Sequence, residues 1–80
     1  MIAMDELIGF VTANTARKKV ITLLGSKGAM EKQQLVKTLH LVGADKTLSE
    51  LAEKGLITTG EKLSLTELGT AVERRVLAVR

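Results

Sequence analysis

Few residues in this chain could carry out covalent or metal chemistry. His40 is the only histidine and there is no cysteine, so no thiol nucleophile or Cys–His pair can form. One histidine without cysteine cannot complete a zinc site, and no acidic spacing resembles a calcium loop. The run Gly25-Ser26-Lys27-Gly28 lacks the full GxxxxGK[ST] phosphate-loop pattern and is better explained as a helix end and a turn. We therefore expect no catalysis, no metal and no cofactor.

The charged residues carry more information, because they are unevenly distributed. The 80 residues have a net charge of +3. Residues 1–13 carry two anions and no cation, residues 47–80 balance five cations with five anions, and residues 14–46 hold seven cations against two anions. Such a basic segment fits a phosphate-facing surface, and it fits an ordinary solvated surface equally well. Its cations are Arg17, Lys18, Lys19, Lys27, Lys32, Lys37 and Lys46.

Three of these cations, Arg17, Lys18 and Lys19, fall in the first turn of an expected helix. Positive charge there opposes the helix dipole by about 0.3–1 kcal/mol per charge, so the pattern hints at an anionic partner. The chain has one phenylalanine and no tyrosine or tryptophan, which leaves no stacking platform for single-stranded nucleic acid. The composition therefore argues against a protein that binds single-stranded nucleic acid.

The composition and length indicate a single small domain over residues 1–80. Hydrophobic residues make up 45% of the chain and charged residues 26%, as in globular proteins. No apolar run approaches the ~20 residues of a membrane span, and Asp5 and Glu6 interrupt what could otherwise resemble a signal peptide. The absence of cysteine fits a reducing compartment. We expect a cytoplasmic protein without membrane contact.

Apolar spacing and glycine positions predict the elements that must hold these charges. Asn14 or Thr15 can cap a second helix, Gly25 would end it, and the pair Ala29-Met30 could add a short edge strand. Thr66 would cap the last helix. The predicted helices are 4–12, 15–24, 31–39, 44–54 and 66–78, and the predicted strands are 56–58 and 63–65.

The region 44–69 is the most specific part of this pattern. Leu48 and Leu51 share a helical face, and Gly55 is placed to end that helix in the left-handed region. Two short β-type runs then flank a turn in which Gly60 can take positive φ. The last helix should bury a stripe of Leu68, Val72, Val76 and Val79. We expect a mostly α protein with a small β-hairpin wing, in a winged helix-turn-helix arrangement.

Three stretches carry a resemblance to a known family: residues 14–24, 51–57 and 65–69. With them, the chain resembles the small winged helix-turn-helix transcriptional regulators of archaea and bacteria. The resemblance implies that helix 44–54 enters the major groove and that the wing tip, with Lys62, reaches a flanking backbone. Carried over to this sequence, the base-reading positions are Ala44, Lys46, Thr47 and Glu50, with Ser49 nearby.

The function implied is regulation of transcription by binding duplex DNA. Phosphate contacts are expected from the basic region, namely from Arg17, Lys18, Lys19, Lys32, Lys37 and Lys46. The alternative is a winged helix that binds another protein without reading DNA sequence. It is favoured by Asp45, Glu50 and Glu53 in helix 44–54 and by a wing tip that lacks arginine.

The two ends of the chain are rich in apolar residues. If exposed together, they would form the kind of patch that marks an interface. We expect a homodimer through the first and last helices, and the alternative is that these helices pack on each other within one chain. The residues concerned are Ile2, Met4, Ile8, Phe10, Val76, Leu77 and Val79.

Overall fold

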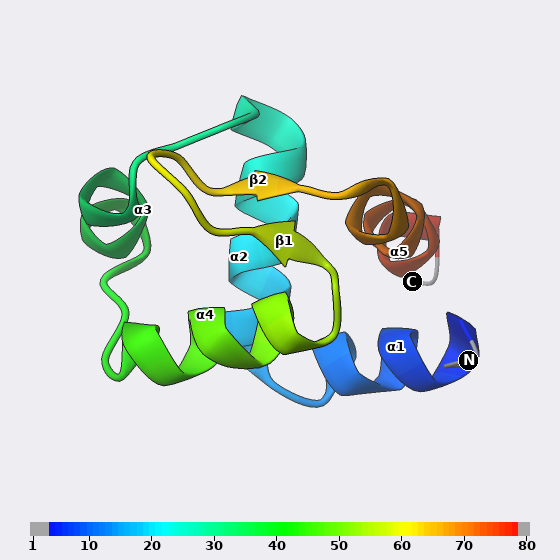
Figure 1. Ribbon diagram of the computed structural model, residues 1–80. Coiled ribbons are helices and arrows are strands. Elements are labelled where there is room, and N and C mark those ends of the chain that lie inside the picture. The colour runs from blue at the N-terminus through cyan, green and yellow to red at the C-terminus, as the bar shows by residue number, and fades with distance from the viewer. Residues whose placement is uncertain (1–3, 79–80) are drawn as a thin grey trace.

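The computed structural model describes residues 4–78, and this part of the chain is mostly α with a small antiparallel hairpin, as expected (Figure 1). Residues 4–78 form α1 (Met4–Thr12), α2 (Thr15–Lys27), α3 (Lys32–Leu39), α4 (Ala44–Glu53), β1 (Ile57–Thr58), β2 (Ser64–Leu65) and α5 (Glu67–Ala78). The predicted bounds of most elements are therefore right to within one or two residues.

Helix α2 is the centre of the packing. It contacts each of the other four described helices and also β2, and in Figure 1 it runs behind the hairpin. Helix α1 packs on α5 as well as on α2, so the first and last described helices lie side by side. Leu51 is fully buried, which confirms it as a core residue. The buried core comprises Leu7, Val11, Val20, Ile21, Leu24, Leu35, Leu48, Leu51, Leu56, Ile57, Leu63, Val72 and Val76.

The hairpin gains a third, one-residue strand from the segment between α2 and α3. In the hairpin itself, Ile57 is opposite Leu65. Met30 pairs antiparallel with Leu63, and their two backbone N–H···O bonds measure 2.9 and 2.7 Å. This confirms the short edge pairing expected near Met30. Gly60 could take positive φ, but it does not do so in the structure. Five residues join the two strands, so no tight two-residue turn is needed.

Helix α2 is longer than the sequence predicts. It passes through Gly25 and ends at Lys27, and Gly28, at φ 82°, donates its N–H to Leu24 O over 2.9 Å. Gly25 is instead the point where the Glu73 side chain of α5 comes against α2, close enough to occupy the space of a Cβ atom. A glycine inside a helix thus serves packing here, and it does not stop the helix.

The turns on both sides of α4 depend on left-handed residues. His40 ends α3 at φ 52°, and Gly43 precedes α4 at φ 69°. Gly55 follows α4 at φ 74°, in the left-handed region predicted for it. Thr66 caps α5, also as predicted, by accepting the N–H of Gly69 over 3.0 Å. Its hydroxyl donates to Gly55 O over 2.5 Å, which ties the two ends of the hairpin together.

The buried face of α5 differs from the expected stripe. Val72 and Val76 are buried, whereas Leu68 is 38% exposed and Val79 lies outside the described residues. Gly69 takes the buried position instead. A Cβ atom there would overlap the backbone carbonyl of Leu56, so α5 crosses the chain at a distance that only glycine allows.

Candidate nucleic-acid interface

The outer face of α4 carries most of the base-reading positions that the resemblance implies. Lys46 and Ser49 are exposed, and Ala44 is half-buried at the start of the helix. Thr47 is the exception, because it is only 8% exposed. It lies on the same side of the helix as Leu48 and Leu51, which packs toward α2 and β1. The expectation that the Thr47 side chain is exposed on the outer face is therefore wrong.

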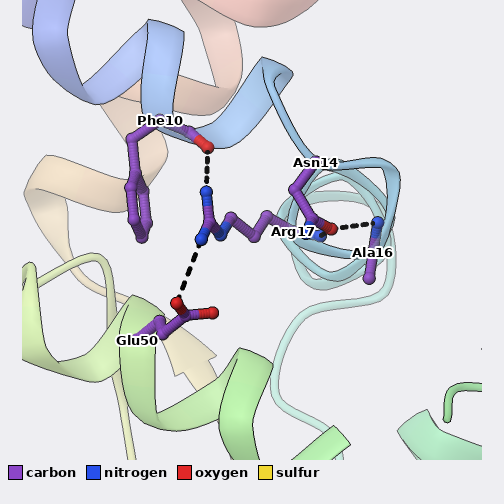
Figure 2. A network of polar contacts seen from close by, with 5 residues as sticks. All are labelled: Phe10, Asn14, Ala16, Arg17 and Glu50. Atoms are coloured by element: carbon purple, nitrogen blue, oxygen red, sulfur yellow. Dashed lines mark hydrogen bonds and ion pairs between the residues drawn. The ribbon is translucent and has the colours of Figure 1, made fainter. Parts of the chain in front are cut away.

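Glu50 does not face solvent freely either, because it pairs with Arg17 of α2. Arg17 Nη2 donates to Glu50 Oε2 over 3.0 Å, with side chains that are 17% and 29% exposed (Figure 2). Asn14 positions this arginine by capping α2, since its Oδ1 accepts the N–H groups of Ala16 and Arg17 over 2.8 and 3.3 Å.

The same guanidinium also holds the C-terminal turn of α1. Arg17 Nη1 donates to Phe10 O over 2.9 Å, which satisfies one of the last carbonyls of that helix (Figure 2). Arg17 Cζ lies 3.9 Å from the centroid of the Phe10 ring, and Lys54 Nζ lies 5.4 Å from it. Arg17 thus joins α1, α2 and α4, and its guanidinium group has its partners within the chain, where the sequence suggested a phosphate contact.

Lys32 and Asp45 form a second ion pair beside α4, linking the start of α3 to the first turn of α4. Both side chains are exposed, at 55% and 83%. Two of the three acidic residues in α4 are therefore matched by cations from other helices. On the remaining solvent face of α4, Lys46 and Glu53 are both exposed and balance each other in charge.

A groove runs between α4, the start of α3 and the hairpin loop. Its base is apolar, formed by Leu48, Ala52 and Leu63, and its rim is polar. Lys62 is exposed in the hairpin loop next to this groove. The structure thus brings part of the predicted site together, namely Lys32 and Ser49 on the groove and Lys46 and Lys62 near it. The rim residues are Lys32, Asp45, Ser49, Glu53, Thr59 and Gly60.

The other predicted phosphate contacts lie elsewhere. Lys18 and Lys19 project from the outer face of α2, where they line a second, shallow groove with Leu39. That face is opposite the buried residues of α2 and away from the Arg17 side that meets α4. Lys37 is exposed on α3. The sequence therefore predicts one basic surface, whereas the structure distributes the same lysines over more than one.

The comparisons with known proteins leave the geometry as the only guide to function. No family model, no curated protein and no solved structure matches the chain. None of the helices in residues 4–78 has the length and apolar character needed to cross a bilayer. In the same residues, no three histidine or acidic side chains gather closely enough to hold a metal ion.

Proposed function

We propose that this chain is a winged helix-turn-helix protein that binds duplex DNA through α4 and regulates transcription in the cytoplasm. In this proposal α3 and α4 form the helix-turn-helix, and the hairpin with its Met30–Leu63 pairing is the wing. Lys46 and Ser49 meet the major groove, and Lys37 and Lys62 supply phosphate contacts.

The observation that carries the proposal is the pairing of the acidic residues of α4. Unpaired carboxylates on this helix would repel phosphate, but Arg17 neutralises Glu50 and Lys32 neutralises Asp45. The outward face of α4 then presents Lys46 and Ser49 without a net negative field. Because few cations remain, we expect weak binding that depends strongly on salt.

We also propose a homodimer through α1 and α5. These helices pack on each other within one chain, as the alternative expected, so the dimer contact would be made by their outer surface, where Leu77 on α5 remains 44% exposed. A single α4 covers one half-site, so a two-fold dimer would bind two half-sites about one helical turn apart and gain specificity.

The competing proposal is a protein-binding winged helix. It is favoured by the groove beside α4, because its base of Leu48, Ala52 and Leu63 is apolar and Glu53 on its rim is not ion-paired within residues 4–78. An apolar groove of this kind suits a peptide better than a phosphate backbone.

The deciding experiment is duplex DNA binding measured by fluorescence anisotropy over a series from about 50 to about 300 mM salt. Each phosphate contact adds ~0.9 to the slope of log K against log salt, so Lys37→Gln and Lys62→Gln should each lower the slope by about that amount. Arg74→Gln, which removes an exposed cation from α5, is the matched control and should leave the slope unchanged.

Sequence reading is tested separately by Ser49→Ala, which should weaken binding to preferred sites and leave binding to random duplexes unchanged. Absence of binding at the lowest salt, in a sample shown to be dimeric, would refute the DNA proposal and favour the protein-binding alternative.

A further inference from the structure

We propose that the outer face of α2 is a docking groove for an acidic amphipathic helix of a partner protein. This surface is distinct from the face of α4 proposed to meet DNA. The groove lies along α2 and reaches the end of α3. It is lined by Thr15, Lys18, Lys19, Thr22, Leu23, Ser26 and Leu39.

The groove has an apolar base and a polar rim. Leu23 of α2 and Leu39 of α3 are half-buried and pack against the core from the outside, so part of each side chain remains open to solvent. Three hydroxyl groups and two lysines surround them. This combination matches an amphipathic helix, which places an apolar stripe in a groove and polar groups around it.

The charge of the rim determines the chemistry of the partner. Within residues 4–78, neither Lys18 nor Lys19 lies within ion-pair distance of a carboxylate, whereas the neighbouring Arg17 is paired with Glu50. The first turn of α2 contains no acidic residue, and Lys18 in that turn opposes the helix dipole. Carboxylates on a bound helix would offset this unfavourable charge and complement the two ammonium groups.

A phosphate backbone fits the groove less well than a helix does, because phosphates cannot cover Leu23 and Leu39. From Thr15 to Ser26 the groove extends for about 16 Å, or three helical turns. A partner helix of that length would place apolar side chains at i, i+3 or i+4, and i+7 over the two leucines. Within residues 4–78, a second copy of this chain offers no such helix, because the apolar stripes of α1, α4 and α5 are buried in its own core and leave Leu68 and Leu77 of α5 as single exposed leucines.

The probe is a synthetic helical peptide of about 14 residues, with leucine at every third or fourth position and glutamate on both flanks. Binding is measured by calorimetry, and the site by amide chemical shifts in NMR spectra of the full chain. We expect shifts confined to residues 15–26 and 39. The double variant Lys18→Glu/Lys19→Glu should bind the peptide at least about tenfold more weakly.

The matched control is Arg74→Glu/Arg75→Glu, which makes the same change in net charge at exposed positions on α5. This control should bind the peptide with the same affinity as the unmodified protein. Melting curves establish that each variant is folded. If Lys18→Glu/Lys19→Glu is unfolded, Lys18→Gln/Lys19→Gln replaces it, with a smaller expected loss of affinity for the peptide.

Three outcomes would overturn the proposal: no binding of the peptide at millimolar concentration, shifts centred on α4, or an equal effect of both charge reversals. A fourth is competition by duplex DNA together with selective loss of DNA affinity in the Lys18/Lys19 variant, because the groove would then belong to the phosphate surface. Since the peptide is titrated without DNA, failure of the DNA proposal leaves this test intact.

Discussion

Gly69 is the residue whose replacement the fold should tolerate least. A Cβ atom at this position would overlap the carbonyl of Leu56, and backbone cannot move aside as a flexible side chain can. We predict that Gly69→Ala lowers the free energy of unfolding by about 3 kcal/mol or more. In a domain of this size each kcal/mol corresponds to about 4–8 °C of melting temperature.

Gly25→Ala is the control for that substitution, since Gly25 also lies inside a helix and against α5. The atoms in its way belong to the end of the Glu73 side chain, which can rotate, and alanine gains up to about 1 kcal/mol in helix propensity. We expect stability within about 1 kcal/mol of the unmodified protein. An equal loss of unfolding free energy in both variants would show that α5 does not cross close to the backbone of Leu56 at Gly69.

His40 carries a conformational cost that a substitution can remove. It is the one residue other than glycine with positive φ among residues 4–78, at φ 52° at the end of α3. We predict that His40→Gly raises the free energy of unfolding by about 0.5–1 kcal/mol in chemical denaturation. Gly55→Ala, the reverse exchange at φ 74°, should lower it by about 1 kcal/mol. A destabilised His40→Gly variant would contradict the left-handed assignment.

At the scale of elements, the Arg17–Glu50 pair connects helices that are distant in sequence. Arg17 also holds Phe10 O and stacks on the Phe10 ring, so its loss should cost more than loss of Glu50. We predict that Arg17→Met and Glu50→Gln are not additive in urea unfolding and show a coupling of about 1 kcal/mol. Additive effects would mean that the two side chains act independently.

Element order was largely predictable, because it depends on local patterns. Apolar spacing, the Asn14 and Thr66 caps and Gly55 act within a few residues of where they stand. The features that the sequence did not reveal are long-range contacts. In the sequence Gly25 resembles a helix stop, because its contact with Glu73 is a long-range one. Nothing near Gly69 in the sequence indicates that α5 crosses the backbone at Leu56.

The candidate site was less predictable for the same reason. Exposure of a residue in α4 depends on which side of the helix packs, and the sequence alone does not show that Thr47 is on the buried side. The sequence shows that Arg17 and Glu50 have opposite charges, but their separation of 33 positions gives no indication that they meet. The sequence likewise groups Lys18 and Lys19 with Lys46 in one basic segment, although the folded chain places them on different surfaces.

At the scale of the whole molecule, the proposed dimer makes the simplest prediction. Sedimentation equilibrium at micromolar concentration should give twice the mass of the chain, and Leu77→Glu on α5 should reduce it to one chain. Val42→Glu is the matched control, since Val42 is 96% exposed in the turn between α3 and α4 and should leave the dimer intact. A monomeric unmodified protein would contradict the dimer.

The hydroxyl of Thr66 has a consequence for how the protein opens. It donates to Gly55 O and accepts from Gly69 N, while Leu56 N donates to Leu51 O and Thr66 N donates to Leu56 O, both over 3.0 Å. The end of α4, the hairpin and the start of α5 are thereby joined into one cooperative unit. In native-state hydrogen exchange, the amides of Leu56, Thr66 and Gly69 should exchange together and only through global unfolding, and Thr66→Val should let them exchange through a local opening.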